Sequence, residues 1–457
     1  MGFIQILEQY KLNDFTLRRK ALMARYYYYP ERTYQETKER ERKEYKLRFD
    51  NKGNIILPEE LKEKLGLKDG GELRVLVHKD RIELFPNIHS LSKLYIEPTS
   101  LCNLSCQTCV RNTWNEPMGE MSLDTFDKIV EQLKDFQYLE TVMFGGFGEP
   151  TYHKDILYMI GKIKSLGLRA EITTNGTLLN EDMIKGLFEN RLDTLWVSMD
   201  GAEDGIFEDI RRGASYKSVI DNLKLIKSLN EKSQHKIKVG IAFVVMKENI
   251  NSLGNLHKLA HRIGATMISV SNVIPYSRDM VDQMLCNFVA ASYDSKNLPP
   301  LSISLPLIDL NQYTKEPLFN LLSYNYNVSI MANPIGTETS KCKFIKERCT
   351  FIRWDGMVCP CMALLHSNNT YSFISSPHSK RDVTAYTLGN INGERLMDIW
   401  NSEEYTSFRN RVDDFDFSPC HACASCELHG ENKSDCFGNT FPTCGGCLWG
   451  QGVIQCP

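Results

Sequence analysis

The sequence contains no apolar run approaching the roughly 18 residues that a membrane-spanning helix needs. A formal net charge of −3 over 457 residues argues against broad electrostatic binding to nucleic acid or acidic lipid. The start of the chain also lacks the charged-then-apolar order of a signal peptide. We therefore expect a cytoplasmic protein with no membrane contact, whose 42% hydrophobic content can fill the cores of two or three domains.

Cysteine, in contrast, is abundant, with 15 residues placed unevenly along the chain. Three lie between positions 102 and 109, one is Cys286, and eleven lie from position 342 onward. Clustered thiols in a chain without an export signal indicate metal or iron–sulfur ligation rather than disulfides. We expect an oxygen-poor cell as the source, and a buried structural role for the isolated Cys286.

The first 88 residues divide into two parts. Residues 1–44 are predicted to form a charged helical arm, and residues 45–88 a small β-rich domain with a helix near 59–66. This β-α-β-β pattern resembles the swapped-hairpin domain of AbrB- and MazE-type transcription factors. The resemblance implies dimerisation or partner docking through residues 45–88. Their mixed charge makes an iron–sulfur DNA-binding regulator the least favoured interpretation.

Residues 89–280 alternate strand-like and helical stretches, which predicts a parallel α/β sheet. Six such units are too few for a closed eight-stranded barrel, so we expect a partial (β/α)6 TIM-like barrel. Active sites in these folds lie beyond the carboxyl ends of the strands. The expected strands are 94–99, 141–145, 169–174, 194–200, 238–246 and 267–273; the expected helix boundaries include Ser122, Gly167 and Asn180.

The pattern Cys102-x3-Cys106-x2-Cys109 begins three residues after the first expected barrel strand. Three thiolates on one short loop can bind three irons of a cubane cluster and leave the fourth iron open for chemistry. A structural zinc site would need a fourth Cys or His close by, and none occurs before His153. The spacing therefore favours a [4Fe–4S] cluster.

Residues 93–274 resemble the radical S-adenosylmethionine (SAM) superfamily. The resemblance implies that SAM chelates the open iron and is cleaved reductively to a 5′-deoxyadenosyl radical, which takes hydrogen from a substrate. It also implies that the loop after the second strand binds the methionyl group, and that polar residues at later strand ends and an arginine bind the rest of SAM. The expected cofactor-binding residues are Gly146, Gly148, Glu149, Asn175, Ser198 and Arg211.

The segment 341–457, which follows a bridging segment at 281–340, holds the remaining thiols. The run from Cys342 through Gly356 to Cys361 resembles the first half of a SPASM domain, which implies two auxiliary [4Fe–4S] clusters. We expect one cluster on Cys342, Cys349, Cys361 and Cys436. The other would take Cys420, Cys423 and two of Cys426, Cys444, Cys447 and Cys456. A pair of zinc ribbons is the competing interpretation, because C-x2-C repeats also suit zinc.

Over nearly its full length the chain resembles the radical SAM maturases associated with tungsten-containing aldehyde:ferredoxin oxidoreductases. That resemblance implies an enzyme that modifies a protein or cofactor target during maturation of a tungsten oxidoreductase. It also implies a protein electron donor such as ferredoxin or flavodoxin. The alternative is a SPASM enzyme that crosslinks or oxidises a ribosomal peptide. We assign no catalytic acid or base: Tyr276 and His257 lie near barrel ends, where such residues are more often structural.

Overall fold

The computed structural model contains two compact units, Met1–Pro86 and Asn87–Pro457, which are described separately. The described residues are 48–49, 51, 55–64, 73–77, 82–114, 116–286, 302–305, 327–330, 333–334, 342–371, 379–418, 420 and 426–455. The expected helical arm at 1–44, most of the bridging segment, and the thiols of Cys423 and Cys456 lie outside these residues.

The N-terminal unit contains two short antiparallel pairs with a helix between them. β1 (Arg48–Phe49) pairs with β2 (Ile55–Ile56), and β3 (Leu73–Val77) pairs with β4 (Ile82–Pro86). Helix α4 (Glu59–Lys64) begins directly after Pro58, a residue that suits a helix start because its φ is already helical. The strands and the helix occur in the expected order; the swapped-hairpin interpretation stays a prediction.

Six parallel strands form the expected partial barrel, which is confirmed. Their order in the sheet is β10-β9-β8-β7-β6-β5, so strands that follow one another in sequence are neighbours in space. β5 and β6 are buried on both faces, as in other parallel sheets, whereas buried and less buried residues alternate along β7 and no residue of the edge strand β10 is fully buried. The strands are β5 (Lys93–Ile96), β6 (Thr141–Phe144), β7 (Arg169–Thr174), β8 (Thr194–Ser198), β9 (Lys238–Val245) and β10 (Met267–Asn272).

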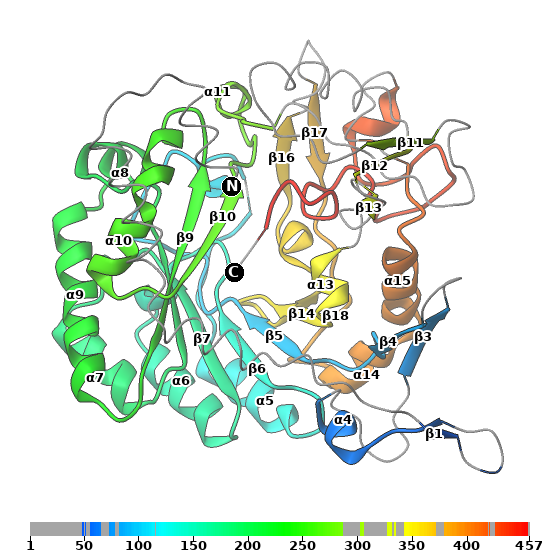
Figure 1. Cartoon of the computed structure of the whole chain (residues 1–457), viewed down its shortest axis with the longest axis horizontal. Coiled ribbons are helices and arrows are strands. Elements are labelled where there is room, and N and C mark those ends of the chain that lie inside the picture. The colour runs from blue at the N-terminus through cyan, green and yellow to red at the C-terminus, as the bar shows by residue number, and fades with distance from the viewer. Residues whose placement is uncertain are drawn as a thin grey trace. The chain divides into compact units, whose positions relative to one another are not determined.

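Helices follow each of the first five strands and lie in an arc around them (Figure 1). The expected caps are present. The side chain of Ser122 accepts a hydrogen bond from Thr125 N, that of Asn180 accepts one from Met183 N, and Gly167 takes a left-handed φ of +78°. The helices are α5 (Leu123–Leu133), α6 (Ile156–Ser165), α7 (Glu181–Glu189), α8 (Asp204–Ile210), α9 (Tyr216–Lys232), α10 (Leu256–Ile263) and α11 (Arg278–Asp282).

A strand from the cysteine-rich segment extends the barrel sheet, which the sequence pattern did not indicate. β14 (Cys349–Ile352) pairs in parallel with β5, and β15 (Met357–Cys359) and β18 (Gly389–Asn390) continue the sheet antiparallel. β14 thereby covers the edge of β5 that the six-stranded barrel would leave open. The C-terminal segment and the barrel consequently share one hydrophobic core.

The rest of the C-terminal segment packs as short elements around that extension. Its helices are α13 (Lys343–Lys346), α14 (Leu396–Asn401) and α15 (Glu403–Asp414), and its hairpin is β16 (Asn368–Tyr371) with β17 (Lys380–Val383). In the bridging segment, β11 (Ser302–Leu305), β12 (Asn327–Ile330) and β13 (Asn333–Pro334) form a small sheet.

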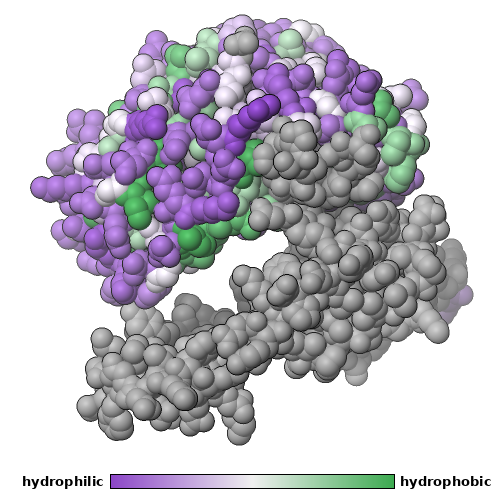
Figure 2. Space-filling view, turned by 90° about the horizontal axis from the view of Figure 1, so that it is seen from above, coloured by the Kyte–Doolittle hydropathy of each residue, from purple (hydrophilic) through white to green (hydrophobic). Residues whose placement is uncertain are grey.

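Hydrophilic residues predominate on the coloured part of the face shown in Figure 2, with smaller groups of apolar residues between them. Among the described residues, no helix combines the length and the apolar character needed to cross a membrane.

Candidate functional site

The cysteine loop, residues 102–109, follows β5 at its carboxyl end, where sites in this fold are expected. Its three thiols are partly exposed. Backbone hydrogen bonds tie the loop to the end of α8: Ser105 N donates to Arg212 O at 3.2 Å and Gln107 N to Ile210 O at 2.9 Å. The loop is therefore held between two strand ends rather than projecting into solvent.

The environment of the three thiols suits thiolate ligands. Leu104 N lies 3.4 Å from Cys102 Sγ, and the Arg111 guanidinium donates to Cys109 Sγ at 3.3 Å. Burial raises the pKa of Cys106 to about 11, with the charge of Arg211 opposing that rise. Hydrogen-bond donors and cations around buried sulfurs stabilise the anionic form that iron requires.

The arrangement of the three thiols differs from that of a site for a single metal ion. No three Cys, His, Asp or Glu side chains in the described part of the chain converge on a position for a single metal ion. The thiols of a cubane each bind a different iron, so they need not converge in that way.

The glycine loop, residues 145–150, follows β6 and packs on the segment that leads to the cysteines. Gly146 has a φ of +146°, a conformation that other residues rarely adopt. A Cβ on Gly148 would lie 2.0 Å from Thr99 O, so only glycine fits there. Glu149 N donates to Leu101 O at 2.8 Å. The glycine loop thus packs directly on the segment that leads into the cysteine loop.

The Glu149 side chain holds the next strand end and does not point freely into a ligand site. Its Oε1 accepts hydrogen bonds from Thr151 N at 3.0 Å and Thr174 Oγ1 at 2.7 Å, and its Oε2 accepts one from Asn175 N at 2.7 Å. Burial raises the pKa of this carboxyl, while those hydrogen bonds counteract the rise. Glu149 therefore connects the glycine loop to the end of β7.

Asn175, just after β7, lies against the cysteine loop. Its Nδ2 is 3.0 Å from Asn103 Oδ1 and 3.8 Å from Cys102 Sγ. Asn103 in turn donates to Thr177 Oγ1 at 2.8 Å. Ser198 ends β8 and is partly exposed. The structure thus brings Asn175 to the cysteine loop and leaves Ser198 at the next strand end.

Arg211 directly follows α8, and its side chain is 12% exposed. Its guanidinium pairs with Asp200, beyond the end of β8, at 2.8 Å. Desolvation would lower the pKa of Arg211, but the charges of Asp200 and Cys106 outweigh it and raise the pKa. Arg211 is therefore a fixed positive charge beside the cysteine loop, and Asp200, which sequence reasoning did not select, orients it.

Four thiols of the C-terminal segment line one pocket: Cys342, Cys361, Cys444 and Cys447. Burial raises the pKa of Cys342 to about 12, and the nearby Cys447 raises it further. Burial likewise raises the pKa of Cys361 and Cys444 well above the ordinary value for cysteine. Cys361 and Cys444 are buried, Cys342 and Cys447 are partly buried, and all four are free thiols, which is the number of donors that a fully ligated cubane needs.

A second group of thiols lies around Cys420. Ser418 Oγ is 3.0 Å from Cys436 Sγ, and the charge of Cys436 contributes to raising the pKa of Cys420 after the larger effect of burial. Cys426 is exposed. Cys423 belongs to the same C-x2-C-x2-C run but lies outside the described residues.

This arrangement differs from the ligand partition expected from the spacing. Cys444 and Cys447, rather than Cys349 and Cys436, accompany Cys342 and Cys361 in the pocket. Cys349 sits within β14 and is 1% exposed, and the charge of the nearby Cys342 contributes to raising its pKa after the larger effects of burial and Glu347. The spacing could not indicate that Cys444 and Cys447 line this pocket, because the chain returns to it only after the hairpin and two helices in between. The expected partition of ligands between the clusters stays a prediction.

Arg381 lies between the two thiol groups. It lines the four-cysteine pocket, is buried, and a Cβ on Gly446 would lie 2.6 Å from its guanidinium carbon. Burial lowers its pKa, whereas the charges of Cys420 and Cys447 oppose that change. Its side chain donates to His429 O. No carboxylate pairs with Arg381 among the described residues, so the cysteines are its neighbouring anions.

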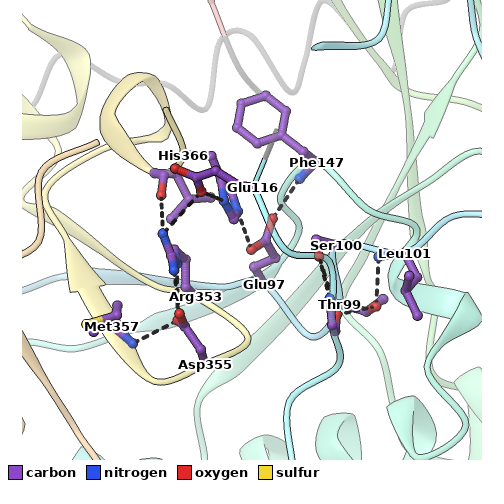
Figure 3. Close-up of polar contacts among 12 residues, drawn as sticks. Glu97, Thr99, Ser100, Leu101, Glu116, Phe147, Arg353, Asp355, Met357 and His366 are labelled. Atoms are coloured by element: carbon purple, nitrogen blue, oxygen red, sulfur yellow. Dashed lines mark hydrogen bonds and ion pairs between the residues drawn. The ribbon is translucent and has the colours of Figure 1, made fainter. Parts of the chain in front are cut away.

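Sequence reasoning also missed a buried polar network beside the glycine loop (Figure 3). His366, from the C-terminal segment, lies between the carboxylates of Glu97 and Glu116, at 2.8 and 2.7 Å. The only signal in the sequence was that Glu97 directly follows the apolar residues of β5. His366 is isolated in sequence and gave none.

Comparisons with known proteins agree with this geometry. A family model described as the radical SAM superfamily matches residues 96–260, and one described as an iron–sulfur cluster-binding domain, SPASM, matches residues 342–427. The tungsten-containing aldehyde ferredoxin oxidoreductase cofactor-modifying protein of Pyrococcus furiosus is 33% identical over 373 residues, which cover 80% of this chain and 96% of that protein.

More distant relatives share parts of the chain. The PqqA peptide cyclase of Bradyrhizobium diazoefficiens is 24% identical over 182 residues, covering 40% of this chain and 46% of that protein. Among solved structures, Streptococcus suis SuiB bound to S-adenosylmethionine matches with a TM-score of 0.47 and 19% identity, covering 73% of this chain and 71% of SuiB.

The cysteine loop, the glycine loop against it, and the thiol-rich C-terminal segment are therefore parts of one enzyme. The chain belongs to the radical SAM superfamily, in the SPASM-containing family of the tungsten-containing aldehyde ferredoxin oxidoreductase cofactor-modifying protein.

Proposed function

We propose that this enzyme cleaves SAM at the cysteine loop and uses the resulting radical to mature a tungsten-containing oxidoreductase or its cofactor. The observation that carries the first half is the contact, at adjacent strand ends, between the glycine loop and the segment that leads into the cysteine loop. The second half rests on the 33% identity to the cofactor-modifying protein over nearly all of that protein's length.

At the first site, Cys102, Cys106 and Cys109 would hold the catalytic [4Fe–4S] cluster. When bound, that cluster supplies the electron that cleaves SAM. The backbone of the glycine loop, including Gly146 and Gly148, would bind the SAM ammonium, since a loop without side chains lets a ligand approach closely.

The neighbouring residues would position the rest of SAM. Asn175 and Ser198 present polar side chains at the next strand ends, where ribose hydroxyls would bind. Arg211 suits the carboxylate of SAM, because a guanidinium pairs with carboxylates in a fixed geometry. Glu149 would act through hydrogen bonds that hold Asn175 in place.

At the auxiliary sites, we assign Cys342, Cys361, Cys444 and Cys447 to one cluster, since these thiols line one pocket. We assign Cys420, Cys423, Cys426 and Cys436 to the second, on the contact network around Cys420 and the C-x2-C-x2-C run. Cys349 and Cys456 are left without a cluster in this assignment. Buried clusters near the substrate could take an electron from it.

The partners follow from the same proposal. The catalytic cluster needs an electron donor, for which a ferredoxin or flavodoxin is the natural class. The target would be a protein or cofactor of a tungsten oxidoreductase. The domain at residues 45–88 would serve dimerisation or docking.

The first test is reductive SAM cleavage. The anaerobically reconstituted enzyme, reduced with dithionite and given SAM, should release 5′-deoxyadenosine and bind roughly twelve irons per chain, four for each of three cubanes. A nucleoside yield no greater than that of the Cys102→Ala, Cys106→Ala, Cys109→Ala triple variant would contradict the proposal. Roughly four irons together with bound zinc would instead support zinc ribbons.

The second test addresses the target. The reduced enzyme with SAM is incubated with the apo-form of a tungsten oxidoreductase encoded beside it. Mass spectrometry of both the protein and its cofactor should show a mass change that requires SAM. Unchanged masses in both, alongside normal 5′-deoxyadenosine release, would remove the tungsten target while leaving the SAM chemistry intact.

Peptide modification is the second candidate, favoured by the 24% identity to the PqqA peptide cyclase over 182 residues. A short precursor-peptide gene beside this one, and a crosslink or oxidation in that peptide after incubation, would support it. A tungsten oxidoreductase gene in the same position supports the first proposal.

A further inference from the structure

A chain of buried contacts runs from the C-terminal segment to the glycine loop. His366 Nε2 lies 2.8 Å from Glu97 Oε2, and the other oxygen of Glu97 accepts a hydrogen bond from Phe147 N at 3.1 Å. His366 and Glu97 are each 1% exposed. One carboxylate therefore joins an imidazole of the C-terminal segment to the backbone of the glycine loop (Figure 3).

The glycine loop wraps closely around that carboxylate. A Cβ on Gly146 would lie 2.6 Å from Glu97 Cγ and 2.7 Å from its Oε1. Because no space separates them, the loop cannot keep its conformation if the Glu97 side chain moves. The orientation of Glu97 is thus part of the geometry of the loop.

His366 also contacts the chain that continues from the cysteine loop. Its Nδ1 lies 2.7 Å from Glu116 Oε2, and its ring centroid lies 4.4 Å from that of Trp114. Trp114 in turn packs edge-on against Phe147, with centroids 5.6 Å apart. A single residue of the C-terminal segment thus touches the end of β5, the cysteine-loop continuation and the glycine loop.

The charges around His366 favour its protonated form. Desolvation would lower the pKa of His366, but its hydrogen bonds to the carboxylates of Glu116 and Glu97 outweigh that effect and raise it. Glu116 also accepts from Ser367 N at 2.7 Å and lies 3.5 Å from Arg353, which pairs with Asp355. A buried ion pair held on both sides is costly to break, because one charge then stays uncompensated.

We propose that His366 is a positioning residue for SAM: it fixes Glu97, and through Glu97 the glycine loop, in the conformation that binds the SAM amino acid. The SPASM-containing segment then sets the affinity for SAM as well as holding the auxiliary clusters. This inference rests on the proposed role of the glycine loop.

The test measures SAM affinity on the reconstituted full-length enzyme, by titrating SAM against the EPR signal of the reduced catalytic cluster. His366→Gln removes the charge and one of the two hydrogen bonds, and we expect it to weaken SAM binding about tenfold. Glu116→Gln alters only the partly exposed end of this chain of contacts, and we expect it to weaken SAM binding about threefold. Iron content and the EPR signals of the auxiliary clusters should stay at wild-type levels, which a general loss of structure would not allow.

His153→Gln is the matched control. His153 is also buried, at 3% exposed, but it contacts the backbone of Met121 and Asp155 rather than a carboxylate. We expect this variant to keep wild-type SAM affinity even if its stability falls.

The inference is overturned if His366→Gln and Glu116→Gln both bind SAM as tightly as His153→Gln does. If His366→Gln fails to fold, Glu116→Gln decides alone, and unchanged affinity there has the same meaning. A wild-type enzyme whose EPR signal does not respond to SAM would instead overturn the proposed function, and this inference with it.

Discussion

The cysteine loop and the four-cysteine pocket are two differently built thiol sites in one molecule. The cysteine loop places three thiols within eight residues, on a turn fixed by the end of α8. The pocket gathers Cys342 and Cys361 with Cys444 and Cys447, from stretches separated by more than 80 residues. A local site needs only its loop, whereas the pocket exists only when the whole C-terminal segment has folded.

The two sites also differ in what they leave open. Three partly exposed thiols leave one iron of a cubane free for a substrate, with Arg111 and Arg211 as neighbouring cations. The four thiols of the pocket would bind all four irons of a cubane, which suits electron transfer rather than ligand binding. The first site is therefore suited to chemistry and the second to receiving its electrons.

The largest expected effect is a loss of iron when two thiols of the pocket are removed, which distinguishes the pocket from the cysteine loop. Cys444→Ala with Cys447→Ala should lose roughly four irons per chain yet still cleave SAM, because the cysteine loop does not depend on the pocket for its ligands. Iron analysis and 5′-deoxyadenosine assays measure both. The matched pair Cys349→Ala with Cys359→Ala removes two buried strand cysteines and should keep roughly twelve irons; the opposite pattern would refute the assignment.

The next effect tests how tightly the first site is packed. Gly148→Ala would place a methyl group 2.0 Å from Thr99 O, which forces apart the glycine loop and the segment leading to the cysteines. We expect SAM affinity to fall more than about tenfold, from a distortion of about 1–3 kcal/mol. Isothermal titration of the reconstituted enzyme with SAM measures it.

The control for that variant is Gly205→Ala. A Cβ at Gly205, in α8, meets no atom within 4 Å, so this change should leave SAM affinity unchanged. Equal affinity in the two variants would show that the close contact at Gly148 is not needed for binding.

A smaller effect concerns the auxiliary region alone. Arg381→Gln removes a buried cation next to Cys420, Cys444 and Cys447. We expect the auxiliary midpoint potentials to fall by on the order of 50 mV, because a nearby positive charge favours the reduced, more negative cluster. EPR-monitored redox titration measures this shift.

Lys380→Gln is the control, since Lys380 is half-exposed and pairs with Asp382. Its removal should hardly change the potentials, because water screens an exposed charge. A shift in the catalytic cluster as large as in the auxiliary ones would contradict the location assigned to Arg381.

The smallest effect is a pH dependence at the junction of the two regions. The pKa of His366 is raised in the folded protein, so its protonation stabilises the fold below its ordinary pKa of about 6.5. This contribution is lost as the pH rises through the folded-state pKa. The free energy of unfolding should therefore differ more between wild type and His366→Gln at pH 6 than at pH 9.

Denaturant unfolding at the two pH values measures this difference. The pKa shift of Glu116 has the opposite sign, since its pKa is lowered to about 2. Its contribution to the free energy of unfolding is therefore present above about pH 4.5 and is lost only as the pH falls toward 2. It therefore does not confound the comparison. If the free energy of unfolding differs between wild type and His366→Gln by the same amount at both pH values, a stabilising imidazolium at His366 is excluded.

Local patterns predicted the barrel well because each strand and cap depends on nearby residues. The six strands lie where the alternation of apolar stretches indicated, and Ser122 and Asn180 cap helices through their own side chains. The cysteine loop was found for the same reason. The placement of β14 beside β5 was not predictable, since nothing in a four-residue apolar strand specifies a partner more than 250 residues away.

The site residues show the same division. Gly148 and Asn175 were selected because they lie in loops that follow strands, where the resemblance to the radical SAM superfamily implies SAM binding. Glu97, Glu116 and His366 meet only through the fold, from positions up to 269 residues apart.

The sequence by itself determined the catalytic loop, because its spacing alone brings three thiols within reach of one cluster. It also determined the family and the repeating βα units, since these are encoded in short segments. Only the tertiary structure decided which distant cysteines share a pocket, and that His366 contacts the glycine loop through Glu97. The physical reason is that long-range contacts are chosen by the packing of whole elements, and packing depends on all residues of the core at once.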